Sequence, residues 1–150
     1  MRTIHTTLLA AGIALAGWAA QAGAGLLSAT GNVIAILDGK LFLGEAEGRL
    51  SGAGTLTIRS QKDPALTCSG QFTSSARLGG VGQLRCSDGV TAIFHFHRLN
   101  VFRGYGDGNM SRGSMSFAYG LSAEEATPFL KLPEGKKLAG SGTELTLVDL

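Results

Sequence analysis

Residues 66–96, LTCSGQFTSSARLGGVGQLRCSDGVTAIFHF, contain both cysteines of the chain and its densest alternation of apolar and polar residues. Alternation with a period of two is typical of strands that bury one face. Ser-Asp-Gly at residues 87–89 predicts a three-residue hairpin loop with its glycine in the left-handed conformation. That loop pairs small or apolar residues across the hairpin, namely Cys86 with Val90, Leu84 with Ala92 and Gly82 with Phe94.

A second hairpin follows if Cys68 is placed opposite Cys86. This register puts Phe72 opposite Gly82, so the glycine lies between two aromatic residues, Phe72 and Phe94, whose rings cover it. Directly opposed antiparallel residues have Cβ atoms about 4.5–5.5 Å apart, within reach of a disulfide. The register therefore predicts a Cys68–Cys86 disulfide.

Residues 1–24, MRTIHTTLLAAGIALAGWAAQAGA, have the pattern of a secretory signal peptide. A basic start precedes an apolar run, and Ala-Gly-Ala provides a cleavage site after Ala24. The apolar run is too short to cross about 30 Å of hydrocarbon, so no transmembrane helix is expected. We expect residues 25–150 to form a single β domain, periplasmic or secreted, in which a disulfide persists.

Charge and composition exclude some classes of partner. Loss of Arg2 with the signal peptide leaves 12 of the 13 basic residues against 11 acidic ones. A near-neutral exported chain does not favour nucleic acid as a partner. The expected partners are an envelope protein, a glycan or a lipid.

Short segments separated by Gly- and Asp-rich turns predict further strands. Ser122 and Glu125 have capping-box spacing, which predicts one short helix near residues 122–130, limited by Pro128. The predicted fold is all-β, a curved antiparallel sheet of eight to ten strands forming a small barrel or sandwich. The glycines of residues 104–108 are expected in a turn with bulges, and the last strand is expected to close the sheet. The additional strands are predicted at residues 29–37, 41–47, 54–59, 99–105, 113–119 and 143–149.

The glycine pattern of residues 70–89, Gly-x-Phe followed by Gly-x-Gly-x-Leu-x-Cys-x-Asp-Gly, resembles uncharacterised small exported Gly-rich β proteins of Gram-negative bacteria. It is also similar to the hairpin repeat called MORN, without a regular array of such repeats. The resemblance covers about twenty residues. It implies β-hairpins and export, and it carries no catalytic residue.

His95 and His97 alternate along a predicted strand, so their rings project from the same face. Two histidines on one face suit a metal site, and a catalytic zinc needs a third protein ligand. Asp or Glu would have to supply that ligand, because His5 leaves with the signal peptide. The alternative interpretation is two solvated histidines on the outer side of a sheet.

Arginines are frequent in the second half of the chain, and the predicted register puts Arg85 and Arg98 on or near the outer face with the histidines. Together with Arg103 they are candidates for an anion-binding patch. Arginines that alternate along strands are more often simply the solvated face of a sheet.

No catalytic constellation and no cofactor motif is present. The sequence has no Gly-x-Ser-x-Gly elbow and no P-loop ending, and both cysteines are assigned to the disulfide. The leading hypothesis is a non-enzymatic exported envelope protein that acts as a binding or structural module. One alternative is a metal-binding protein or hydrolase that uses His95 and His97. Another is a small outer-membrane β-barrel, which the short predicted strands disfavour.

Overall fold

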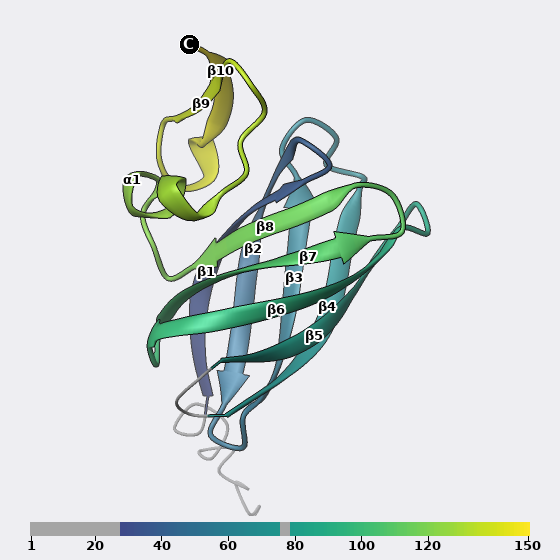
Figure 1. Ribbon diagram of the computed structural model, residues 1–150, viewed down its shortest axis with the longest axis vertical. Coiled ribbons are helices and arrows are strands. Elements are labelled where there is room, and N and C mark those ends of the chain that lie inside the picture. The colour runs from purple at the N-terminus through teal and green to yellow at the C-terminus, as the bar shows by residue number, and fades with distance from the viewer. Residues whose placement is uncertain (1–27, 76–78) are drawn as a thin grey trace, which may run out of the picture.

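The computed structural model describes residues 28–75 and 79–150. Within these residues eight antiparallel strands close into a barrel in which each strand pairs with its neighbour in sequence (Figure 1). Pairing of β1 with β8, with Ile34 opposite Ala118, completes the ring. The predicted all-β class is confirmed, and of the two predicted architectures the chain forms the barrel. The strands are β1 (Ser28–Leu37), β2 (Lys40–Arg49), β3 (Ala53–Ser60), β4 (Thr67–Ser75), β5 (Gly79–Cys86), β6 (Thr91–Asn100), β7 (Arg103–Met110) and β8 (Ser114–Tyr119).

Strands β4, β5 and β6 pair in the register predicted from sequence. Cys68 lies opposite Cys86 and forms a disulfide with it, and Gly82 lies between Phe72 and Phe94. A Cβ atom at Gly82 would overlap the ring of Phe94, which explains why this central strand carries a glycine. The loop glycine, Gly89, has φ +89°, in the left-handed region.

Apolar side chains of alternate strand residues fill the barrel interior. At the end that carries the disulfide, Leu37, Met115 and Val90 are buried with the two cysteines. On β2 the inner face carries Phe42, Gly44 and Ala46. The inner residues include Val33, Ala35, Leu56, Ile58, Leu84, Ala92, Phe94, Phe96 and Phe117.

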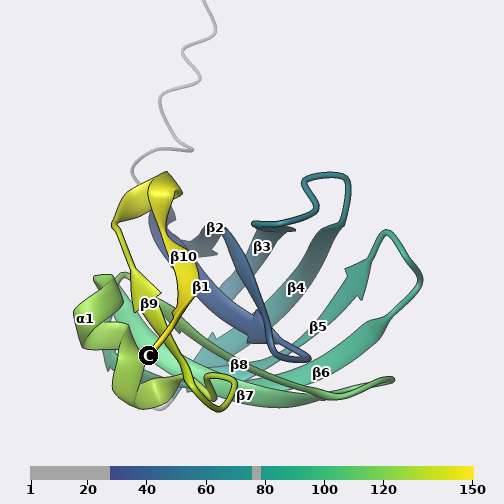
Figure 2. The same cartoon turned by 90° about the horizontal axis from the view of Figure 1, so that it is seen from above.

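A second apolar cluster lies outside the barrel, where the C-terminal segment covers β1, β2 and β8 (Figure 2). Because of this cover β1 is buried on both faces, which accounts for its unbroken apolar run Val33-Ile34-Ala35-Ile36-Leu37. The buried Ser116 hydroxyl accepts a hydrogen bond from the Lys131 amide at 2.8 Å. The segment comprises α1 (Ala123–Ala126), the 3₁₀ turns η1 (Thr127–Phe129) and η2 (Gly142–Glu144), β9 (Lys136–Ala139) and β10 (Thr146–Asp149).

The predicted short helix is confirmed with its capping box. The Ser122 hydroxyl accepts from the Glu125 amide, and the Glu125 carboxylate accepts from the Ser122 amide, both at 3.2 Å. Pro128 lies in the 3₁₀ turn η1, which follows α1 directly. Because proline has no backbone N–H to donate, it ends the α-helix here, as the sequence predicts.

Three sequence-based assignments of strands and turns were wrong. The strand predicted at 99–105 is interrupted by the turn between β6 and β7, at residues 101 and 102. The glycines of 104–108 form part of strand β7 and no turn, because Gly104 and Gly106 lie against the aromatic rings of Tyr119 and Phe117 on β8. The last strand, β10, pairs with β9 outside the barrel, and β8 performs the closure instead.

The barrel has an apolar interior and largely polar outward side chains. Outward positions of β3 and β4 carry residues such as Thr55, Thr57 and Gln71, whereas the interior is apolar. A barrel that spans an outer membrane has the reverse polarity, with an apolar band outside and a polar lumen. The outer-membrane alternative is therefore disfavoured by polarity. Strand length gives no such argument, since β1, β2 and β6 each have ten residues.

No helix in the described part of the chain is long and apolar enough to cross a bilayer.

Candidate ligand-binding cavity

A cavity of about 250 Å³ occupies the barrel end opposite the disulfide. This end is formed by the start of β1, the β2–β3 turn and the β6–β7 turn, and it is the lower end in Figure 1. Its depth is lined by Leu56, Phe94 and Phe117. The cavity is thus an open continuation of the apolar core.

Small residues on the inner strand faces create the space. At Gly48 a Cβ atom would meet one atom within 4 Å, the tip of the Phe72 ring at 4.0 Å. At Gly31 the nearest atoms would be 3.7 Å away, an ordinary contact distance. Ala46 adds a third small side chain to the lining. Side chains of ordinary size at these positions would fill the cavity.

Aromatic rings form one wall and hold each other in place. Phe72 meets Phe96 edge to face with ring centroids 5.3 Å apart, and Phe94 meets Phe117 in the same way at 5.3 Å. Phe96 also contacts Tyr119, at 6.1 Å. Edge-to-face pairs of this kind favour one arrangement of the rings, so the wall is preformed.

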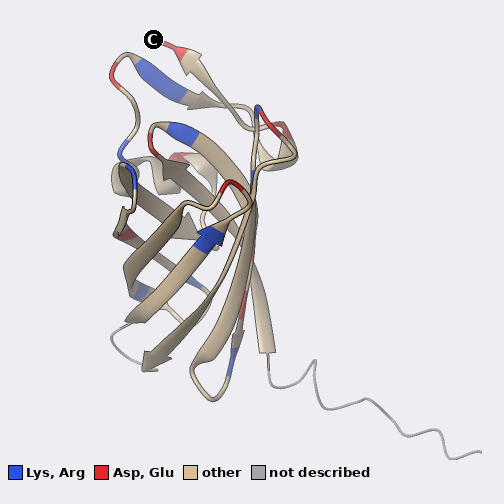
Figure 3. Ribbon diagram, turned by 90° about the vertical axis from the view of Figure 1, so that its right-hand side faces the viewer, with Lys and Arg blue, Asp and Glu red and all other residues tan. Residues whose placement is uncertain are grey.

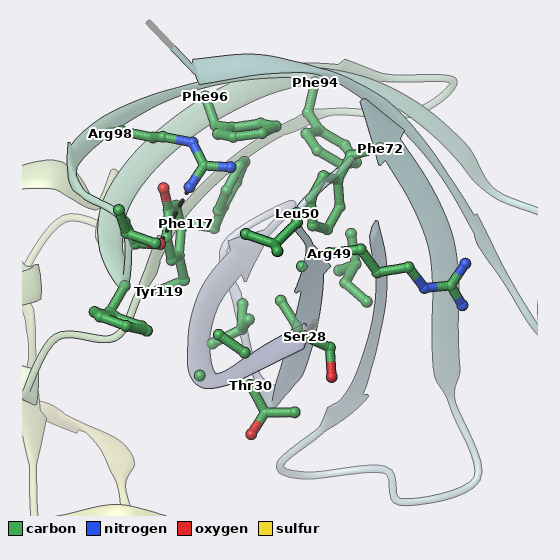
Figure 4. A pocket seen from close by; sticks show the side chains of 18 residues that line it. Ser28, Thr30, Arg49, Leu50, Phe72, Phe94, Phe96, Arg98, Phe117 and Tyr119 are labelled. Carbon is green, nitrogen blue, oxygen red and sulfur yellow. Dashed lines mark hydrogen bonds between the residues drawn. The ribbon is translucent and has the colours of Figure 1, made fainter. Parts of the chain in front are cut away.

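Arg98 projects into the cavity between these rings (Figure 4). The expectation that Arg98 lies on or near the outer face with the histidines was wrong, because it continues the inward series of Phe94 and Phe96. Its terminal nitrogens donate to the Ser74 hydroxyl at 2.6 Å and to the Val101 carbonyl at 3.1 Å, and its guanidinium lies 6.0 Å from the Phe96 ring centroid. No carboxylate among the described residues forms an ion pair with it. The buried Nε has no hydrogen-bond partner there either.

Tyr119 places a further polar group in the lining, beside Arg98. Its hydroxyl oxygen is buried and has no hydrogen-bond partner within the described residues. Burial raises the pKa of the Tyr119 phenol above its ordinary value, and the nearby positive charge of Arg98 offsets part of that rise. The phenol is therefore neutral at physiological pH and available as a donor.

Large apolar side chains stand exposed around the mouth. Leu50 is 80% exposed in the β2–β3 turn, and Val101 and Phe102 are 63% and 62% exposed in the β6–β7 turn. All three also line the cavity. Exposed apolar side chains that gather in one patch mark a binding site, whereas single exposed apolar residues are ordinary on protein surfaces.

His95 and His97 project outward from β6 and are exposed, on the same face as predicted. His95 lies opposite Asp107 on β7, and the His97 ring lies 5.5 Å from the ring of Tyr105. Among the described residues no group of three His, Cys, Asp or Glu side chains is close enough to hold a metal ion. Zinc binding by this pair stays a prediction.

The three arginines of the predicted anion patch do not come together. Arg85 projects outward near the disulfide end of β5, Arg98 projects inward, and Arg103 forms an ion pair with Glu125 on the outer side. Lys and Arg are dispersed along the chain among Asp and Glu (Figure 3). Of these three arginines, Arg98 is the one that lines the cavity, and it forms no ion pair with a carboxylate among the described residues.

Fold and cavity together define a class, a closed eight-stranded β-barrel with an apolar interior that opens at one end. No known protein family, curated protein or solved structure matches the chain. The function proposed below therefore depends on the geometry of the cavity.

Proposed function

We propose that this protein is a non-enzymatic exported binding module that holds a small apolar ligand in the open end of its barrel. The observation that carries the proposal is the preformed aromatic cavity with an exposed apolar rim. A ligand in the cavity covers the exposed side chains of Leu50 and Phe102 at the mouth and buries its own apolar surface. Removal of these apolar surfaces from water contributes favourable free energy of binding.

The size of the cavity sets the size of the ligand. Cavities of about 150 Å³ hold benzene, and pockets for drug-sized molecules start at about 300 Å³. At about 250 Å³ this cavity suits a short acyl chain or a one- to two-ring compound. A full-length phospholipid would leave most of its chains outside.

Binding can be measured with the neutral two-ring fluorophore 6-propionyl-2-(dimethylamino)naphthalene, whose blue emission rises in apolar surroundings. We expect a saturable rise on addition of the purified protein, reversed by octan-1-ol. Gly48→Leu directs a side chain into the cavity and should abolish the rise while leaving the barrel folded. Arg85→Gln, on the outer face, should bind as the unmodified protein does. Absence of a saturable signal, or equal binding by Gly48→Leu, would contradict the proposal.

Export is a separate part of the proposal, supported by the signal-peptide pattern and compatible with the disulfide. The predicted cleavage site lies outside the described residues. Expression in a Gram-negative host, followed by mass spectrometry of the periplasmic fraction, should give a chain that begins at Gly25. A chain that retains Met1 in the cytoplasm would contradict this part and leave the cavity proposal standing.

A further inference from the structure

We infer that the cavity takes an amphipathic carboxylate, with its acidic head group held by Arg98 and Tyr119 and its apolar chain directed toward Phe94 and Leu56. This inference rests on the proposed function and specifies its ligand class. Two arginines line the cavity, and Figure 4 shows the guanidinium of Arg49 directed away from the space and that of Arg98 directed into it. Arg98 takes part in none of the three ion pairs of the described residues, so its charge has no carboxylate partner there. A cation placed among aromatic and aliphatic groups gains most from an anion that enters the same space.

The free donors of Arg98 match a carboxylate. A guanidinium has five N–H donors, and two are used by the Ser74 hydroxyl and the Val101 carbonyl. The remaining donors include Nε–H, which has no partner in the described residues. Nε–H and a terminal N–H point in parallel, the arrangement that binds two oxygens of one carboxylate. The two bonds already made hold the guanidinium in place.

Tyr119 adds a neutral donor beside the cation. Arg98 and Tyr119 both lie opposite Gly104, so their side chains occupy adjacent positions on the inner wall. A hydroxyl that burial keeps protonated donates to an anion without adding charge. One positive charge and one neutral donor balance a monoanion. A phosphate dianion would leave an uncompensated charge in this apolar space.

The position of Arg98 fixes the orientation of the ligand. Arg98 lies two residues before Asn100, where β6 ends at the mouth, whereas Phe94 lies four residues further inside. The cavity floor at Leu56, Phe94 and Phe117 carries no charge. A head group at Arg98 therefore lies near the rim, and the chain extends into the core.

Displacement of the neutral fluorophore by matched eight-carbon ligands tests the inference. We expect octanoate to bind the unmodified protein at least about tenfold more tightly than octan-1-ol, and more tightly than octyl phosphate. Arg98→Gln should reduce octanoate affinity to about that of octan-1-ol in the same variant, whereas Arg85→Gln, on the outer face, should keep the tenfold difference. Arg98→Lys, which keeps the charge and loses the parallel donors, should recover only part of the difference.

A spectroscopic readout uses the unmodified protein and does not depend on how the Arg98 variants fold. Octanoate should produce an ultraviolet difference spectrum from the Tyr119 phenol that octan-1-ol does not produce and that Tyr119→Phe lacks. Equal binding of octanoate and octan-1-ol, or tighter binding of octyl phosphate, would overturn the carboxylate assignment and keep the proposed function. Failure of every ligand and of the fluorophore would overturn the proposed function itself.

Discussion

Arg98 on β6 and Tyr119 on β8 lie directly opposite the same residue, Gly104 on the intervening strand β7. Because Gly104 has no side chain, nothing on β7 separates the guanidinium from the phenol. The same arrangement recurs one step further in, where Gly106 lies between Phe96 and Phe117. The glycines of β7 thus create the space in which large groups of the two flanking strands meet.

Substitution of Gly104 should disturb this pair directly. A Cβ atom there would overlap the Tyr119 hydroxyl and the His97 carbonyl oxygen, so we expect Gly104→Ala to lower the free energy of unfolding by about 1–3 kcal/mol and to weaken ligand binding. Gly48→Ala is the matched control, since its Cβ has room, and it should change stability by less than about 0.5 kcal/mol. Urea unfolding followed by circular dichroism measures both. Equal stability of the two variants would contradict this account of β7.

The disulfide should stabilise the barrel without shaping the cavity. Cys68 and Cys86 are 18 residues apart, a separation for which a cross-link contributes about 3 kcal/mol. We expect the double variant Cys68→Ala, Cys86→Ala to lose roughly that amount in urea unfolding, and to keep its affinity for the fluorophore because the cavity lies at the other end. Reductant should leave the double variant unchanged. A loss of binding without a loss of stability would show that the two ends are coupled.

Stability at high pH should report on Tyr119. The pKa of its phenol is raised in the folded state, so its contribution is complete below the unfolded-state value of about 10 and is lost as pH rises through the folded-state value. The unmodified protein should therefore lose stability above about pH 10, and Tyr119→Phe should lose less. Tyr105→Phe removes the other tyrosine and should retain the Tyr119 contribution. Identical alkaline losses in all three proteins would contradict the burial of Tyr119.

Strict alternation made the centre of the fold predictable. Between Cys68 and Phe96 one register follows from the short Ser-Asp-Gly loop and the other from the placement of Cys68 opposite Cys86. In both, a shift by one residue would expose the whole apolar set. The disulfide and the position of Gly82 between two rings followed from that register. Across the β6–β7 turn the same reasoning failed, because Val101 and Phe102 are apolar residues that form an exposed turn and give no turn signal.

The cavity was harder to infer than the strands. Arg98 and Tyr119 continue the inward alternation of Phe94 and Phe96 and of Met115 and Phe117, so period two alone places both inside. A preference for arginine at the surface outweighed that signal. The residues at the mouth of the cavity are determined by which turns lie together at one end of the closed barrel. The pairing of β1 with β8, which closes the barrel, was not evident from local sequence. The unbroken apolar run in β1 is typical of a strand that is buried on both faces, so it could have indicated the cover by the C-terminal segment.

Leu145 tests whether the C-terminal segment is part of the folded unit. Its side chain is 1% exposed in the apolar cluster between this segment and the outer side of the barrel. Leu145→Ala leaves a cavity there, and we expect a loss of about 2–5 kcal/mol in the free energy of unfolding, in a single transition. Leu150→Ala, 83% exposed, should have no measurable effect. Fluorophore binding under native conditions should be the same in both variants, since Leu145 lies outside the barrel wall. A separate early transition for Leu145→Ala, or a loss of binding with the barrel still folded, would show that the segment and the ligand cavity are organised differently.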